Sequence, residues 1–303
     1  MPLYRITHST HYRHQSAATM AWQALHLQPR HEATQHCDRF ELEIAPHPTD
    51  LAPRVDYFGN KQHIFTLREP HRELAITSRS VVRREEPPLP SPGLTPALSE
   101  LRRADNHAVQ EDFTLEQFRH PSALVPLLAG AAALVSELTS DLASGGMPVL
   151  LWLGELGRRF CAAFRFDATA TRISTPLTDV LATRRGVCQD FAHLLISGLR
   201  QYGLPAAYVS GYLLTKPPPG QPRLIGADAS HAWVSVFVPG TGWVDYDPTN
   251  GCFVAAGHIV VARGRDFFDV SPVKGLFSGG GGQTLRTGVT VELVEPPDQV
   301  DLL

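Results

Sequence analysis

The sequence lacks paired cysteines, a long hydrophobic run and a strong charge excess. Its four cysteines, Cys37, Cys161, Cys188 and Cys252, are dispersed and form no C-x-x-C pair, which argues against a disulfide framework or a zinc finger. The most hydrophobic run, residues 124–135, is interrupted by a proline and is too short to cross a bilayer. The formal net charge of −3 gives no electrostatic basis for binding nucleic acid or an anionic membrane.

The first eight residues also lack the apolar core of a signal peptide. We therefore expect a cytoplasmic protein with no nucleic-acid or membrane partner. The oligomeric state cannot be inferred from the sequence. Three-residue spacing of His8, His11 and His14 in a strand-like region would place them on alternating faces, so we expect no metal site there.

Length and composition indicate an ordinary globular protein with two domains, because the chain has 303 residues, 43% of them hydrophobic and 19% charged. Residues 1–86 show the partial alternation of strands at 3–7, 40–44 and 74–77, which predicts a β-sandwich-like N-terminal domain. Five prolines make residues 87–96 a stiff linker. Residues 97–255 combine a helical segment, broken at 144–146, with a core that begins near residue 166. Residues 256–303 form a C-terminal β extension with strands at 258–261 and 287–293.

Cys188 is predicted to lie in the first turn of a helix. The following hydrophobic residues recur at three- and four-residue steps and so share one face: Phe191, Leu194, Leu195, Leu199 and Tyr202. Gly203 and Pro205 end this pattern. Unpaired backbone N–H groups and the positive end of the helix dipole favour a thiolate at such a position and can stabilise an oxyanion beside it.

His231 and Asp247 lie in two predicted strands, residues 230–238 and 243–247, joined by the turn-forming residues 239–242. If the loop is Pro239–Thr241, closed by Val238 and Gly242, His231 and Asp247 share a face one diagonal step apart. A loop one residue longer or shorter would place them on opposite faces. A thiol, an imidazole and a carboxylate are the components of an activated nucleophile with an oriented base.

The segments 186–193, 230–233 and 243–250 resemble the three core motifs of the transglutaminase-like superfamily. The whole chain resembles the bacterial transglutaminase-like family of candidate cysteine proteases, since residues 55–60 and 264–272 are similar to flanking elements of that family. The resemblance implies an α+β, papain-like core in which a helix bearing the cysteine packs on an antiparallel sheet bearing the histidine and aspartate. It also implies that Cys188, His231 and Asp247 are the catalytic residues.

Other residues near these motifs have less certain roles. Asp245 competes with Asp247 for the orienting role but lies further from His231 on the assumed register. Asp190 is expected to cap the helix, and His193 to be a core or interface histidine. Asp228 is a candidate for the substrate cleft. Trp152 is a candidate oxyanion donor by resemblance to animal transglutaminases, or a core residue.

The sequence thus predicts a thiol-dependent acyl-transfer enzyme that acts on peptide or carboxamide bonds and needs no metal or organic cofactor. Transfer of the acyl group to water, as in a cysteine peptidase or amidase, is favoured over transfer to an amine, as in a transglutaminase. A non-catalytic binding module or an assembly protein with the same fold are the alternatives. Intact Cys, His and Asp positions argue against both.

Overall fold

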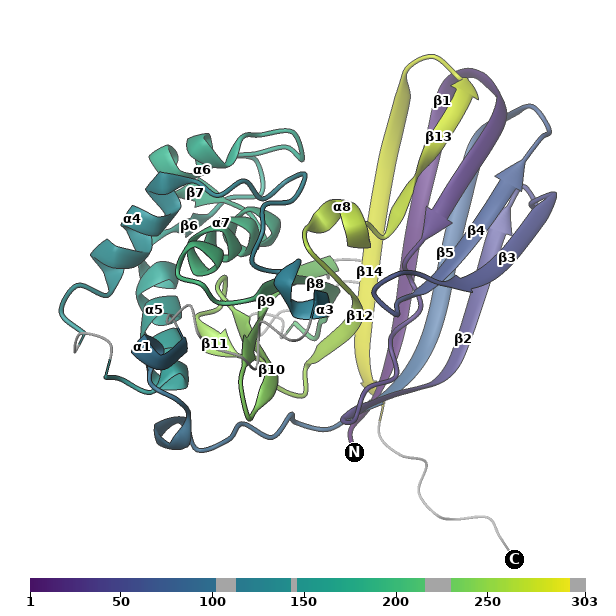
Figure 1. The fold of residues 1–303 in the computed structure, drawn as a ribbon. Helices are drawn as coiled ribbons and strands as arrows, with labels where there is room; N and C mark the ends of the chain where they lie inside the picture. The colour runs from purple at the N-terminus through teal and green to yellow at the C-terminus, as the bar shows by residue number, and fades with distance from the viewer. Residues whose placement is uncertain (102–112, 143–145, 216–229, 295–303) are drawn as a thin grey trace, which may run out of the picture.

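The computed structural model describes residues 1–101, 113–142, 146–215 and 230–294. The chain forms two lobes, a β lobe built mainly by the N-terminal strands and a core lobe of helices and a second sheet (Figure 1). The C-terminal segment enters both lobes, because β12 (His258–Gly264) joins the core sheet whereas β13 (Val273–Gly279) and β14 (Gln283–Val294) pair with the first strand of the β lobe.

The β lobe is organised around one long strand, β1 (Leu3–Leu25). Its other N-terminal strands are β2 (Gln35–Ala45), β3 (Asp50–Val55), β4 (Lys61–Leu67) and β5 (His71–Arg84). The first half of β1 lies between β5 and β14, and its second half lies between β4 and β13. Residues of both halves, such as Tyr12 and Leu25, share one buried cluster. The predicted strands at 3–7, 40–44 and 74–77 are confirmed, and the two halves pack as a sandwich.

The segment after β5 crosses to the core lobe with one 3-10 turn, η1 (Pro92–Leu94). The described helices that follow are α1 (Leu98–Leu101), α3 (Phe113–Glu116), α4 (Ala129–Leu138), α5 (Val149–Ala163) and α6 (Leu177–Thr183). The helical character expected of residues 97–165 is confirmed for these ranges. Most of the predicted break at 144–146 lies outside the described residues. None of the described helices has the length and hydrophobicity needed to cross a membrane.

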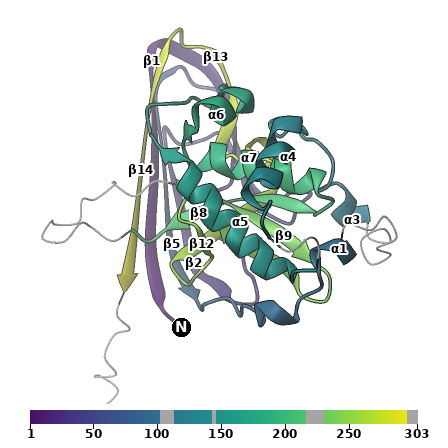
Figure 2. The same ribbon diagram turned by 90° about the vertical axis from the view of Figure 1, so that its left-hand side faces the viewer.

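The core sheet has the order β11-β10-β9-β8-β12, and all of its pairs are antiparallel. Its remaining strands are β8 (Ala206–Leu213), β9 (Ser230–Val238), β10 (Gly242–Asp247) and β11 (Cys252–Phe253). Helix α7 (Cys188–Gln201) packs on this sheet, and α4, α5 and α6 pack around α7, so that the helices form one layer (Figure 2). This arrangement is the predicted α+β, papain-like core.

Alternation along β9 and β10 assigns one face of the sheet to the helices. Val234, Val236 and Tyr246 belong to the large buried cluster that includes α7 and α5. The intervening residues, among them Trp233 and Asp245, point to the other face. The short parallel pair β6 (Arg165–Phe166) and β7 (Arg185–Gly186) lies just before α7 and fixes the approach of the chain to Cys188.

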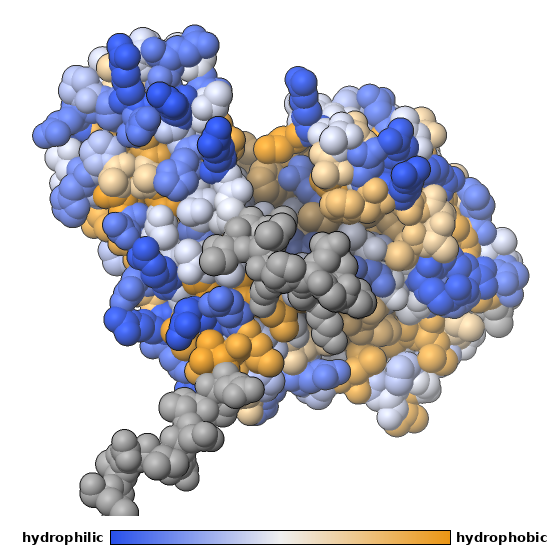
Figure 3. Space-filling view, turned by 180° about the vertical axis from the view of Figure 1, so that it is seen from behind, coloured by the Kyte–Doolittle hydropathy of each residue, from blue (hydrophilic) through white to orange (hydrophobic). Residues whose placement is uncertain are grey.

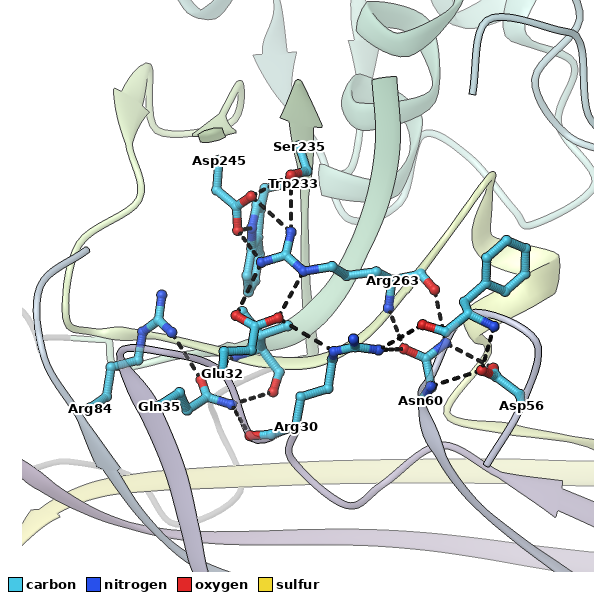
Figure 4. A network of polar contacts seen from close by, with 12 residues as sticks. Arg30, Glu32, Gln35, Asp56, Asn60, Arg84, Trp233, Ser235, Asp245 and Arg263 are labelled. Carbon is cyan, nitrogen blue, oxygen red and sulfur yellow. Dashed lines mark hydrogen bonds and ion pairs between the residues drawn. The ribbon is translucent and has the colours of Figure 1, made fainter. Parts of the chain in front are cut away.

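The two lobes are joined by a buried polar network (Figure 4). Asn60, which is fully buried, accepts a hydrogen bond from the backbone N–H of Arg263 and donates one to the Arg263 carbonyl, both at 2.8 Å. The Arg263 guanidinium also pairs with Glu32 and with Asp245. The two family-like segments 55–60 and 264–272 are therefore neighbours in space. Hydrophobic side chains also appear on both lobes beside their junction (Figure 3).

Candidate active site

Cys188 is the first residue of α7, as predicted, and its side chain is partly exposed. The preceding residue, Val187, is extended, and its backbone N–H donates to Oδ2 of Asp190 at 2.9 Å. The predicted helix-capping role of Asp190 is thus confirmed. Thr171 also donates to this oxygen, at 2.6 Å. A Cβ on Gly186 would lie 2.8 Å from the same carboxylate, so glycine is required for this tight entry into the helix.

The backbone N–H of Cys188 has no hydrogen-bond partner among the described residues. This follows from its place at the start of the helix, where the first N–H groups have no carbonyl one turn earlier. An unpaired N–H beside the sulfur is a donor for an oxyanion that forms when the thiolate attacks a carbonyl.

His231 and Asp247 meet because the hairpin register is the one assumed from the sequence. Gly242 pairs with Val238 and Trp243 with Phe237, which confirms the Pro239–Thr241 loop. Nε2 of His231 donates to Oδ2 of Asp247 at 2.7 Å. The Cys188 side chain is the second hydrogen-bond partner of this imidazole, and Nδ1 is the ring nitrogen left to face it. The structure therefore brings the three residues together in the order thiol, imidazole, carboxylate.

The pKa values of His231 and Asp247 are both shifted so that the charged form of each residue is favoured. Burial lowers the pKa of His231, but the hydrogen bonds and negative charges of Asp247 and Cys188 outweigh burial and raise it to about 10. Burial raises the pKa of Asp247, but hydrogen bonds from His231 and His258 and the imidazolium charge hold it well below its usual range. The site consequently keeps an imidazolium beside the Asp247 carboxylate at neutral pH.

The Asp247 carboxylate is held by more groups than His231. It is fully buried, and its Oδ1 accepts from the backbone N–H groups of Thr249 and Asn250 at 2.9 and 3.2 Å. Its Oδ2 also accepts from Nδ2 of Asn250 at 2.7 Å and from Nε2 of His258 at 3.1 Å. Hydrogen-bond donors thus occupy all the acceptor positions of the Asp247 carboxylate. They fix the position of this carboxylate relative to His231.

His258 was not predicted from the sequence. It begins β12, and its Nδ1 accepts from the backbone N–H of Ala255 at 3.3 Å. Because Nδ1 is an acceptor there, the ring proton lies on Nε2 and points at Asp247. The local pattern of residues 258–261 indicates a strand and gives no sign of this contact. Asn250, in contrast, could have been noticed, because Asx side chains after an aspartate commonly close such turns.

The other residues singled out in the sequence do not contact His231 or are not described by the structure. Asp245 bonds to Arg263, Ser235 and Trp233 rather than to His231. His193 is buried, and burial lowers its pKa to about 4, so it is a neutral core histidine, as expected. Asp228 lies outside the described residues.

The structure does not place Trp152 at this site. Its buried indole stacks on Tyr202, with ring centroids 5.7 Å apart. Tyr202 caps the C-terminal end of α7, roughly 20 Å along the helix axis from Cys188. The indole therefore packs in the core at the far end of the helix. Phe160, two turns further along α5, instead contacts Phe191 near the start of α7, so the two helices run side by side in opposite directions. The core-packing alternative for Trp152 is the one the structure supports.

A metal ion could in principle use part of this site. His231, Asp247 and His258 offer ligand atoms that all lie within 4.8 Å of one another, and such donors suit zinc. A cation would have to displace the imidazolium proton of His231, whose pKa is raised to about 10. It would also separate this imidazole from Asp247. The acid–base arrangement accounts for these contacts without a metal.

Comparisons with known proteins agree with this architecture. The model of the bacterial transglutaminase-like N-terminal region matches residues 4–83, and that of the transglutaminase-like superfamily matches residues 155–248. An uncharacterized protein of Mycobacterium tuberculosis is 40% identical over 284 residues, which cover 90% of this chain and 87% of that protein. A Pseudomonas aeruginosa protein named protein-glutamine gamma-glutamyltransferase is 38% identical over only 68 residues, 22% of this chain and 10% of that protein.

A solved structure from Cytophaga hutchinsonii, described as a candidate cysteine protease, superposes with a TM-score of 0.75 and 17% identity. The match covers 97% of this chain and 91% of that one, so both lobes share its fold. The two family models, the extended relative and the common fold together show that this chain belongs to the bacterial transglutaminase-like family of the transglutaminase-like superfamily.

Proposed function

We propose that this protein is a thiol-dependent acyl-transfer enzyme that cleaves peptide or carboxamide bonds through Cys188, His231 and Asp247. One observation carries the proposal: a single imidazole is hydrogen-bonded to a buried carboxylate at 2.7 Å on one side and to a helix-start cysteine on the other. This is the arrangement of an activated nucleophile with an oriented base. No step requires a cofactor.

The reaction begins with attack of the Cys188 thiolate on the carbonyl carbon. The oxygen of the tetrahedral intermediate becomes negative and is stabilised by the backbone N–H of Cys188. The His231 imidazolium donates its Nδ1 proton to the departing nitrogen, and the C–N bond breaks to leave a thioester. His231 is then neutral and accepts a proton from the incoming acceptor. Collapse of the second intermediate releases the acyl product and restores the thiolate–imidazolium pair.

Asp247 acts through His231. Its carboxylate holds the imidazole with Nε2–H bonded and Nδ1 directed at the sulfur, and it stabilises the imidazolium charge. The donors from Thr249, Asn250 and His258 prevent the carboxylate from rotating away. The energetic benefit is preorganisation, because no group has to reorient when the charge moves from sulfur to substrate.

We propose water as the main acceptor, so that the enzyme acts as a cysteine peptidase or amidase. Water is present at ~55 M, and an amine competes only if the cleft excludes solvent. The candidate that remains is transfer to an amine, as in a transglutaminase. It is favoured by the short match to the P. aeruginosa protein named protein-glutamine gamma-glutamyltransferase.

The first test measures the reactivity of Cys188. The protein is treated with limiting iodoacetamide at pH 6, and each cysteine peptide is quantified by mass spectrometry. Burial raises the pKa of Cys37 to about 11 and also raises the pKa values of Cys161 and Cys252. We therefore expect Cys188 to be labelled first, at least about tenfold faster than exposed Cys252. Equal rates at Cys188 and Cys252 would reject the activated-nucleophile proposal.

The second test identifies the acceptor by product mass. A glutamine-containing peptide that loses its side-chain amide gains about 1 Da, whereas amine incorporation adds the amine minus ammonia. We expect free acid as the main product, with a low-millimolar primary amine diverting a minor fraction. Cys188→Ser is the control and should give neither product. Dominant amine adducts would replace the hydrolase proposal with the transglutaminase one.

A further inference from the structure

A cavity of about 780 Å³ lies between the two lobes, and its lining includes Asp245, two residues before Asp247 on β10. Its lining includes loop residues of the β lobe, the linker, the turn after α3 and the start of β10. Cys188, His231, Asp247 and His258 do not line it. Trp243, which does, pairs with Phe237, six residues along β9 from His231 and thus roughly 20 Å away.

The walls of this cavity are mainly apolar. Phe58, Leu89, Phe118, Trp243 and Val254 contribute most of the hydrocarbon surface. Leu89 and Trp243 are 44% and 37% exposed, so they lie where the cavity opens to solvent. A cavity of this size, at a junction between lobes and with apolar walls, is typical of small-molecule sites.

One region of the lining carries charge (Figure 4). Three guanidinium groups, of Arg30, Arg84 and Arg263, meet two carboxylates, of Glu32 and Asp245. Arg263 pairs with both carboxylates, at 2.9 Å to Glu32 and 2.8 Å to Asp245. Arg30 pairs with Glu32 at 3.3 Å. Both carboxylates are therefore engaged by Arg30 or Arg263, and neither forms an ion pair with Arg84.

Arg84 is the guanidinium of this group without a carboxylate partner among the described residues. It is 1% exposed, and its one side-chain hydrogen bond to a described residue runs from Nη1 to Oε1 of Gln35, at 3.1 Å. Its Nε is buried without a partner, and no described carboxylate forms an ion pair with it. Burial lowers the pKa of Arg84, although Glu32 and Asp245 oppose this from a distance. A buried guanidinium without a counter-ion is costly unless something else supplies the charge.

We propose that the cavity binds a small apolar monocarboxylate, whose anionic group pairs with Arg84 and whose hydrocarbon body lies against the aromatic and aliphatic walls. A single unpaired guanidinium matches a single negative charge. Arginine presents two parallel N–H donors to a carboxylate. The resulting ion pair is therefore both strong and fixed in its geometry. The ligand supplies the carboxylate that Arg84 lacks among the described residues. This site is separate from the acyl-transfer site and does not depend on the proposed function.

The test uses octanoate and its neutral isostere octanamide as probes, measured by isothermal titration calorimetry on the full chain. Both should bury the same alkyl chain, but octanoate also pairs with Arg84. We expect octanoate to bind at least about tenfold more tightly than octanamide. Octanoate should also change the fluorescence of Trp243, a change that Trp243→Phe removes. Equal affinities, or no binding of either probe at millimolar concentration, would overturn the proposal.

Two matched pairs of variants locate the charge that is recognised. Arg84→Gln should abolish the preference for octanoate, whereas Arg83→Gln, an exposed neighbour paired with Asp38, should retain it. If Arg84→Gln fails to fold, Leu89→Asp supplies the test, because it places a negative charge at the cavity mouth. Leu89→Asp should weaken both probes by removing apolar surface, but it should weaken octanoate several-fold more than octanamide, because the new negative charge repels only octanoate. Leu94→Asp, at a residue that is 86% exposed and outside the lining, should change neither affinity. An unchanged preference in Arg84→Gln or Leu89→Asp would contradict the proposal.

Discussion

At the scale of single residues, two aspartates two positions apart on β10 have different tasks. Asp247 holds His231, whereas Asp245 holds Arg263 at the junction of the lobes. Both are buried and both point to the same face of the sheet, so neither burial nor strand position separates them. What distinguishes Asp247 from Asp245 is the side chain that each one binds. This difference can be tested by measuring the effect of each substitution on turnover and on stability separately.

The first prediction concerns this pair. Asp247→Asn should lower turnover per folded molecule by about 10² or more, because an amide holds the imidazole tautomer poorly. Asp245→Asn should instead lower stability, by ~3 kcal/mol, because it leaves the buried Arg263 with an incomplete partner. Its turnover per folded molecule should remain near wild type. Thermal melts and active-site titration distinguish the two effects. Greater loss of turnover in Asp245→Asn at equal folded fraction would be incompatible with the site described above.

A second residue-scale prediction concerns His258, which donates to the same carboxylate oxygen as His231. His258→Phe keeps an aromatic ring of similar volume but removes this donor. We expect kcat to fall about tenfold with KM little changed, because Asp247 becomes less well fixed while substrate contacts remain. The pH at which activity is lost should also move. Retained kcat in a folded His258→Phe protein would show that the donors from Thr249 and Asn250 suffice.

At the scale of elements, the site depends on how α5 and α7 pack on the core sheet. Gly157 on α5 faces the ring of Tyr246, the residue just before Asp247, and a Cβ on this glycine would overlap that ring. A Cβ on Gly154, one turn earlier, would lie 3.3 Å from the ring of Phe253, a tight contact that a small shift of this ring relieves. The close approach of α5 to β10 therefore requires glycine at one of these two positions.

The third prediction compares these glycines. Gly157→Ala should lower the free energy of unfolding by about 1–3 kcal/mol, because Tyr246 must shift. Gly154→Ala should change it by less than about 1 kcal/mol, since the intrinsic helix preference of alanine offsets mild crowding. Chemical denaturation measures both. Similar effects of the two substitutions would mean that Tyr246 can move at little cost.

At the scale of the whole molecule, the charges of the active site affect the stability of the fold. The pKa of His231 is raised to about 10, so its contribution is complete below its ordinary value of 6.5 and disappears as pH rises toward 10. The pKa of Asp247 is lowered, so its contribution is present above 3.8 and is lost as pH falls below that value. The pair should therefore stabilise the fold most between about pH 4 and pH 6.5.

The fourth prediction tests this dependence. The difference in Tm between wild type and His231→Gln should be largest near pH 6 and should narrow by at least about 4 °C at pH 10. His11→Gln, on the exposed side of β1, is the control and should show a small, pH-independent difference. A His231→Gln difference that stays constant from pH 6 to pH 10 would show that the imidazolium is not stabilised as described.

Much of the site could be predicted because its geometry is local to two structural elements. A cysteine at a helix start and a hairpin with a three-residue loop fix where Cys188, His231 and Asp247 point. The hairpin register was an assumption about the loop, which the structure confirmed; a one-residue slip would have moved His231 to the other face. The strands of the β lobe were predictable for the same reason, because half-buried strands show a period of two in their side chains.

Contacts between distant segments required the tertiary structure. His258 meets Asp247 only because β12 adds to the far edge of β8 and its loop returns beneath β10. Trp152 could not be placed, because helical spacing shows which face of α5 is buried but not in which direction α5 runs beside α7. Likewise, β13 and β14 read as strands in the sequence, but their pairing with the two halves of β1 depends on closing loops of more than 200 residues.

The sequence by itself placed Cys188 at a helix start and His231 and Asp247 on one face of a hairpin, since side-chain spacing follows directly from helix and strand geometry. The catalytic roles proposed for these three residues came from the family resemblance. Only the tertiary structure decided which groups share a buried environment. It enclosed Arg84 without a counter-ion, gave Asp247 a second histidine and assigned Asp245 to Arg263. The physical reason is that desolvation and charge pairing act between neighbours in space, and these neighbours come from segments whose distance in the sequence carries no periodic signal.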